Sequence, residues 1–115
     1  MTRQLIINAD GFGFGPGATQ GILDAIAAGG PITSVSVNAN FPEAERVHDL
    51  MAQHPEISIG VHVNPIVGAP CLPPAQVPTL VGPDGQFHGG RFRSLWRRGR
   101  ISILELEAEL DRQLK

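Results

Sequence analysis

The chain has 115 residues, 42% of them hydrophobic, and a formal net charge of -2 at pH 7, which is the composition of an ordinary globular domain. Because there is no general excess of basic residues, neither nucleic acid nor an anionic membrane surface is expected as the main partner. The one cysteine, Cys71, excludes an internal disulfide and is typical of a reducing compartment. No apolar run reaches the roughly 20 residues of a membrane span. Residues 1–4 lead directly into an apolar segment, so we expect no signal peptide and a cytoplasmic location.

Strands and helices are predicted to alternate over the first part of the chain. The expected elements are a strand at 4–10, a helix at 16–28, a strand at 32–39, a helix at 42–53 and a strand at 56–64. The first helix begins at Pro16, a residue that suits a first helical turn, and ends before the glycines that precede Pro31. Strand–helix–strand units form right-handed crossovers and parallel sheets, so residues 1–64 are expected to form an α/β core.

Residues 65–100 are rich in proline and glycine and are predicted to form a long loop over the surface, typical of a lid or a substrate wall. A helix is expected at 101–115, because Ser102 and Glu105 form a capping box. Its predicted apolar stripe consists of Ile103, Leu106, Leu110 and Leu114. The arginines between positions 91 and 100, next to Phe92 and Trp96, fit either an anion-binding patch or a solvated loop that balances the acidic helix, and we favour the solvated loop.

Side-chain alternation divides each predicted strand into an aliphatic face and a polar face. Asn8 and Asp10 share the polar face of the first strand, and Asp10 is the acid that ends its apolar run. An unpaired charge is costly to bury, and α/β enzymes place catalytic carboxylates at the carboxyl ends of strands. We therefore expect Asp10 and His62 to meet at one rim, with Asn38 and Asn64 as candidate substrate-binding residues.

The glycines after the first strand also permit a second interpretation. Residues 13–18 match G-x-G-x-x-A, a relaxed dinucleotide-binding pattern between a strand and a helix. Against it, Asp10 would place negative charge beside a pyrophosphate, and the second strand ends in Asn38-Ala39-Asn40, where a ribose-binding acid is expected. A nucleotide-binding α/β module therefore remains an alternative.

Several motifs are similar to one protein family. The segment Asn8-Ala9-Asp10-Gly11-Phe12-Gly13 resembles the N-A-D-D-F-G opening of the YdjC-like carbohydrate deacetylases, the group that contains chitooligosaccharide deacetylase. The segment Gly60-Val61-His62-Val63-Asn64 resembles the G-x-H-x-N of that family. Residues 71–74, 77–81 and 84–87 resemble the loop of the branch associated with hopanoid biosynthesis. The resemblance extends over essentially all 115 residues.

This resemblance implies a distorted TIM-like (β/α) barrel with a divalent metal, magnesium or zinc, that removes N-acetyl groups from an amino sugar or glycan. Asp10 then corresponds to the general base and His62 to a metal ligand. The family's second aspartate, also a ligand, is Gly11 here, and its remaining histidine ligand lies after a further helix and strand, beyond Lys115. A catalytic metal normally has about three protein ligands, so metal binding by this chain alone is expected to be weak or absent.

We therefore expect a single partial barrel domain, residues 1–115, that forms the N-terminal portion of a deacetylase-type fold. It would be a truncated reading frame, a cleaved fragment or a degenerate paralogue with impaired activity. Uncovered strand edges and apolar surface predict that it associates with itself or with a complementary C-terminal fragment. A non-catalytic binding or assembly subunit built from the same half-barrel is the other alternative.

Overall fold

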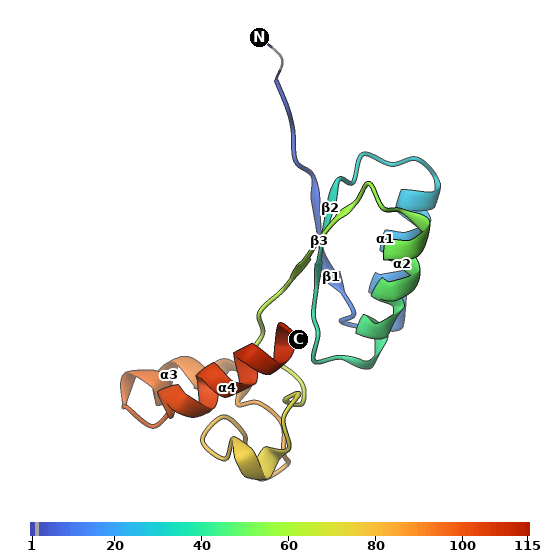
Figure 1. Cartoon of the computed structure of the whole chain (residues 1–115). Coiled ribbons are helices and arrows are strands. Elements are labelled where there is room, and N and C mark those ends of the chain that lie inside the picture. The colour runs from blue at the N-terminus through green and yellow to red at the C-terminus, as the bar shows by residue number, and fades with distance from the viewer. Residues whose placement is uncertain (2) are drawn as a thin grey trace. The chain divides into compact units, whose positions relative to one another are not determined.

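The computed structural model describes residue 1 and residues 3–115. The chain forms two compact units, Met1–His62 and Val63–Lys115. The boundary lies two residues before the end of the predicted α/β core. The elements of both units appear in Figure 1.

The first unit is built on a three-stranded parallel sheet with strand order β1-β2-β3. Its strands are β1 (Asn8–Phe12), β2 (Ser34–Val37) and β3 (Ser58–Val61). They are connected by α1 (Pro16–Ala27) and by a 3-10 turn, η1 (Pro42–Arg46), that continues into α2 (Val47–Gln53). The expected order of elements is confirmed, but the predicted helix at 42–53 is divided between these two helical types. The fold is thus mixed α/β with parallel strands, as expected for part of a barrel.

Both α1 and α2 lie on one side of the sheet (Figure 1). The core between the helices and the sheet consists of the buried residues Phe12, Ile26, Val35, Val37, Ala44 and Leu50. The opposite side of the sheet carries no helix within this unit and presents the polar side chains of β1 and β2. The sheet therefore has one aliphatic face and one polar face, as side-chain alternation predicted.

The extent of β1 differs from the prediction, which placed the strand at 4–10. Val35 pairs with Ala9 and Val37 pairs with Phe12, so β1 contains one residue more than β2 between these pairs. This β-bulge shifts the alternation by one position. As a result Phe12, which simple alternation puts on the polar face with Asp10, is fully buried in the core. Burial of this ring explains why the strand continues beyond Asp10.

The second unit is a small fold of its own rather than a structureless loop. It contains two 3-10 turns, η2 (Pro74–Gln76) and η3 (Gly89–Arg91), and the helices α3 (Phe92–Arg97) and α4 (Ile103–Gln113). Its core is formed by Val77, Leu80, Phe87 and Ile101. The predicted loop at 65–100 therefore includes a short helix and most of an apolar core. The prolines of this segment did not prevent the core from forming, because none of them occupies a buried position.

Helix α4 holds the preceding loop through its polar side chains. The carboxylate of Glu109, which is fully buried, accepts hydrogen bonds from the backbone N–H groups of Cys71 and Leu72, both at 2.9 Å. Glu105 accepts from the backbone and the hydroxyl of Thr79, at 2.8 and 2.7 Å. A loop that cannot pair in a sheet must satisfy its N–H groups elsewhere, and these carboxylates do so.

The predicted apolar stripe of α4 does not coincide with its buried face. Leu106 packs against the core of the second unit, but Ile103 and Leu114 are 67% and 63% exposed. Leu104, on the same side of the helix, is 78% exposed. These apolar side chains line a shallow surface groove of about 720 Å³. The inward side of α4 instead carries Glu105 and Glu109, because their hydrogen bonds to the loop determine which side of the helix faces inward.

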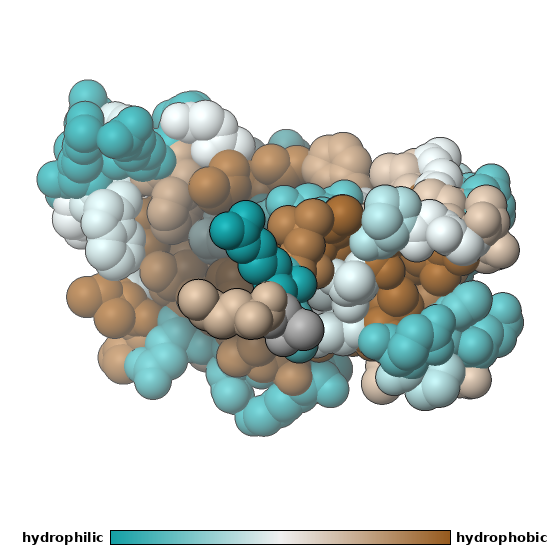
Figure 2. Space-filling model, turned by 90° about the horizontal axis from the view of Figure 1, so that it is seen from above, coloured by the Kyte–Doolittle hydropathy of each residue, from teal (hydrophilic) through white to brown (hydrophobic). Residues whose placement is uncertain are grey.

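Apolar side chains are also exposed in the first unit, where Leu5 and Ile6 are 76% and 77% accessible. Figure 2 shows hydrophobic side chains at several places on one face of the molecule, interrupted by hydrophilic ones. Within the described residues, no helix has both the length and the apolar character needed to cross a bilayer.

Candidate functional site

A network of polar side chains covers the open face of the sheet around Asp10. The side-chain amide Nδ2 of Asn8 donates to Asp10 Oδ1 at 2.8 Å and to Ser36 Oγ at 2.9 Å. Ser34 Oγ donates to Asn8 Oδ1 at 2.6 Å. The register explains this arrangement, because Asn8 pairs with Ser34 across the parallel ladder and Ser36 lies two residues further along the same face.

The imidazole of His62 lies at the same place. Its backbone N–H donates to the carbonyl of Val37 at 2.7 Å, which continues the β2–β3 ladder one residue beyond β3. Its Nδ1 is 3.8 Å from Asp10 Oδ1. This separation is too long for a direct hydrogen bond, but it is within ion-pair distance when the imidazole is protonated. The structure therefore brings Asp10 and His62 to one rim.

Both groups are open to solvent, with the His62 side chain 45% exposed and that of Asp10 69% exposed. Opposite Ser36 in the register stands Gly60, where a Cβ would meet no atom within 4 Å. A reactant therefore has free access to the carboxylate and the imidazole.

The bulge explains the glycine beside Asp10. Gly11 has a φ of +91°, in the region that side-chain-bearing residues rarely adopt, and a Cβ placed there would contact nothing within 4 Å. Gly13, at φ +89°, has no such space, because a Cβ would lie 2.9 Å from the carbonyl oxygen of Asn38. The first glycine is thus favoured by backbone conformation alone and the second also by close packing.

The two asparagines predicted to bind substrate occupy different surroundings. Asn38 is buried, and its side-chain amide donates to the carbonyl of Phe12 at 3.3 Å, which connects the ends of β1 and β2. Asn64 belongs to the second unit, where its Oδ1 accepts from the backbone N–H groups of Ile66 and Val67 and stabilises a turn. Both contacts are structural, so neither gives independent support to a role in substrate binding.

The residues present do not form a metal centre by themselves. Over residues 1 and 3–115, no group of three or more His, Cys, Asp or Glu side chains is arranged to hold a metal ion. Asp10 and His62 offer two donors, and Gly11 offers none. Catalytic metal sites normally use about three protein ligands, so this donor set does not fit a complete site.

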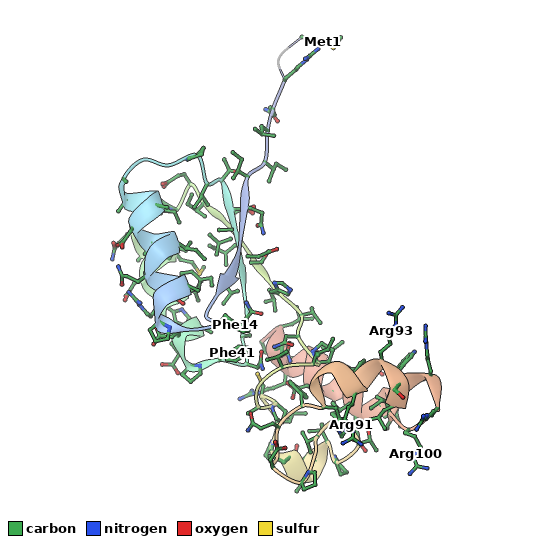
Figure 3. All side chains as sticks on the ribbon, turned by 180° about the vertical axis from the view of Figure 1, so that it is seen from behind. Met1, Phe14, Phe41, Arg91, Arg93 and Arg100 are labelled. Atoms are coloured by element: carbon green, nitrogen blue, oxygen red, sulfur yellow. The ribbon has the colours of Figure 1, made fainter. Side chains whose placement is uncertain are left out.

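The arginine-rich segment between positions 91 and 100 does not converge on a single anion site. Its arginines are exposed, and in the described part of the chain none of them takes part in an ion pair. Figure 3 shows Arg93 and Arg100 pointing in opposite directions from this segment. This geometry favours the solvated alternative, but the segment is not a loop throughout, because Phe92–Arg97 form α3.

One site residue received no role in the sequence analysis, although its signal was present. Asn8 was placed on the face of Asp10 by alternation, but its bonds with Ser34 and Ser36 depend on the register of two strands 26 residues apart. The aromatic pair Phe14 and Phe41 (Figure 3) was also not foreseen. The centroids of the two rings are 5.1 Å apart.

Comparison with known proteins shows which family this geometry belongs to. Residues 4–115 match the family of YdjC-like proteins. The chain is 36% identical over 114 residues to a carbohydrate deacetylase of Geobacillus stearothermophilus and 34% identical over 116 residues to a chitooligosaccharide deacetylase of Serratia marcescens. These matches cover 99% and 98% of the chain but 42% and 43% of the relatives, so the chain spans less than half of their length.

A solved structure shows the same fold. A proposed cellobiose-phosphate cleavage protein of Enterococcus faecalis superimposes with a TM-score of 0.74 and 34% identity, over 94% of this chain and 41% of the other. The structural similarity and the sequence matches therefore support the same assignment. The chain belongs to the family of YdjC-like proteins.

Proposed function

We propose that this chain forms part of the active site of a carbohydrate deacetylase that removes N-acetyl groups from amino sugars. The observation that carries this proposal is the 3.8 Å approach of the Asp10 carboxylate to the His62 imidazole on an open polar face. Its support from relatives is that the chain matches proteins named carbohydrate deacetylase over nearly all of its length. The assignment to the hopanoid-associated branch remains a prediction.

In the proposed reaction Asp10 acts as the general base. A water molecule attacks the acetyl carbonyl, Asp10 accepts its proton, the C–N bond breaks, and the proton passes to the departing amine. An exposed carboxylate suits this role because both water and substrate can reach it.

His62 is the proposed metal ligand, by the family resemblance. Because the described residues do not complete a metal site, we propose that this chain alone binds magnesium or zinc weakly. Isothermal titration with each metal tests this proposal, and dissociation constants above the micromolar range are expected. Stoichiometric sub-micromolar binding that His62→Ala abolishes would contradict it.

The function is best tested in a complete protein. Replacing the matched 114-residue segment of the Geobacillus stearothermophilus relative by this chain gives a chimera whose acetate release from N,N'-diacetylchitobiose can be measured. Gly11→Asp in this chimera is expected to raise the rate, and Asp10→Asn in the same background to abolish it. A folded chimera with Asp at position 11 that releases no acetate, or that is unaffected by Asp10→Asn, would refute the proposal.

A second candidate function, assembly, is favoured by the exposed apolar side of α4. Ile103, Leu104 and Leu114 are each more than 60% accessible, which is unusual for neighbouring side chains on one helix. We propose that this side packs against another polypeptide, either a second copy or a complementary part of a YdjC-like protein. A monomer at tens of micromolar in sedimentation velocity would exclude self-association.

A further inference from the structure

We propose that Asn8 is a positioning residue that holds the Asp10 carboxylate in the orientation needed for catalysis. This inference rests on the proposed function for its catalytic meaning, because it assigns Asp10 the role of base. The structural part of the proposal is that Asn8 maintains one preferred orientation of the Asp10 side chain. This part can be tested without an activity assay.

The amide of Asn8 is bound on both of its polar ends. Its two N–H groups point at Asp10 Oδ1 and Ser36 Oγ, at 2.8 and 2.9 Å, and its oxygen accepts from Ser34 Oγ at 2.6 Å. Exchanging the oxygen and nitrogen would bring the amide oxygen against the carboxylate of Asp10, two acceptors in contact. The orientation with nitrogen toward Asp10 is therefore strongly preferred.

Asp10 has little else to hold it. Its side chain is 69% exposed, and in the part of the chain that the structure describes, the bond from Asn8 is the only direct hydrogen bond to its carboxylate. His62 Nδ1, at 3.8 Å, is beyond hydrogen-bond length. An exposed aspartate without a fixed partner samples several staggered rotamers, so the bond from Asn8 selects the one that faces His62.

The serines complete the support. Ser34 and Ser36 lie on β2, on the same face as Asn8, and hold its amide through their hydroxyl groups. Asp10 itself lies in the β-bulge, where backbone pairing is interrupted between Ala9 and Phe12. Bulges commonly redirect side chains next to active sites. Here the hydrogen bond from the Asn8 amide fixes the orientation of the Asp10 carboxylate that the bulge redirects.

Three-bond coupling constants in the isotopically labelled chain measure the χ1 rotamer of Asp10. One dominant rotamer is expected in the wild type and averaged couplings in Asn8→Ala, with Ser36→Ala between them. Ser58→Ala, which changes an exposed residue of β3, is the matched control and is expected to leave the couplings unchanged. Averaged couplings in the wild type, or an unchanged rotamer in a folded Asn8→Ala variant, would overturn the proposal.

The chimera described above separates positioning from function. Asn8→Ala is expected to lower kcat about ten- to a hundred-fold with little change in KM, because misplacement of a catalytic group costs rate rather than binding. If Asp10→Asn abolishes activity while Asn8→Ala leaves kcat unchanged, positioning is refuted and the deacetylase function stands. If Asp10→Asn has no effect, the function is refuted and the rotamer measurement still decides the role of Asn8.

Discussion

The buried carboxylate of Glu109 permits a quantitative prediction about the second unit. Replacing Glu109 by alanine removes the acceptor of three hydrogen bonds, from the backbone N–H groups of Cys71 and Leu72 and from Gln113 Nε2 at 2.8 Å. The three donors then lie in an environment that water enters only in part, since the bonds from Cys71 and Leu72 are part-buried and that from Gln113 is buried.

The expected loss follows from the number of these bonds. A hydrogen bond to a charged group contributes about 1.5–3 kcal/mol when buried. We take about 1 kcal/mol for each, because water reaches two of the donors and because removing the carboxylate also relieves its desolvation cost. Glu109→Ala should therefore lower the free energy of unfolding by roughly 3 kcal/mol, a large part of the 5–15 kcal/mol of a typical domain.

Urea denaturation followed by tryptophan fluorescence measures this loss. Trp96 is the one tryptophan of the chain and lies in α3, within the same unit, so its emission reports the unfolding of that unit. Glu107→Ala is the matched control, because Glu107 is an exposed acid on the same helix, and it should change stability by at most about 0.5 kcal/mol. A Glu109→Ala variant as stable as this control would refute the reasoning.

Three further predictions concern single positions. Gly11→Ala should destabilise the first unit by about 1–2 kcal/mol, because of its positive φ, whereas Gly21→Ala inside α1 should stabilise it by about 0.5–1 kcal/mol; thermal unfolding followed by circular dichroism measures both, and equal effects would contradict the argument. Burial raises the pKa of the Cys71 thiol and the charge of Glu109 raises it further. The stability of the second unit should therefore be intact below the ordinary thiol pKa and should fall as the pH rises from there through the raised value, a dependence that urea titrations should find missing in Cys71→Ser. Leu104→Glu should abolish any concentration-dependent association of the chain in sedimentation velocity, and association that survives this change would exclude the exposed side of α4 as the contact surface.

Local patterns in the sequence were sufficient to predict the order of elements and, within the site, the positions of Asp10 and His62. Apolar periodicity distinguishes strands from helices, and the period of two placed Asn8 with Asp10 and separated both from the aliphatic side of β1. The motifs around Asp10 and His62 indicated the family, which the comparisons confirm. These features depend on neighbouring residues, so they can be seen without knowledge of the fold.

Contacts between distant segments determined the rest. The bulge in β1 depends on pairing with β2, and it moved Phe12 from the polar face into the core. The inward side of α4 depends on unpaired backbone groups of a loop more than 30 residues away, which bind Glu109 and leave Leu104 in solvent. Alternation records where a side chain points along a regular element. Only the tertiary structure decides where that element is interrupted and which backbone donors its polar side chains must satisfy, because both depend on strand register and on hydrogen bonds between segments far apart in the chain.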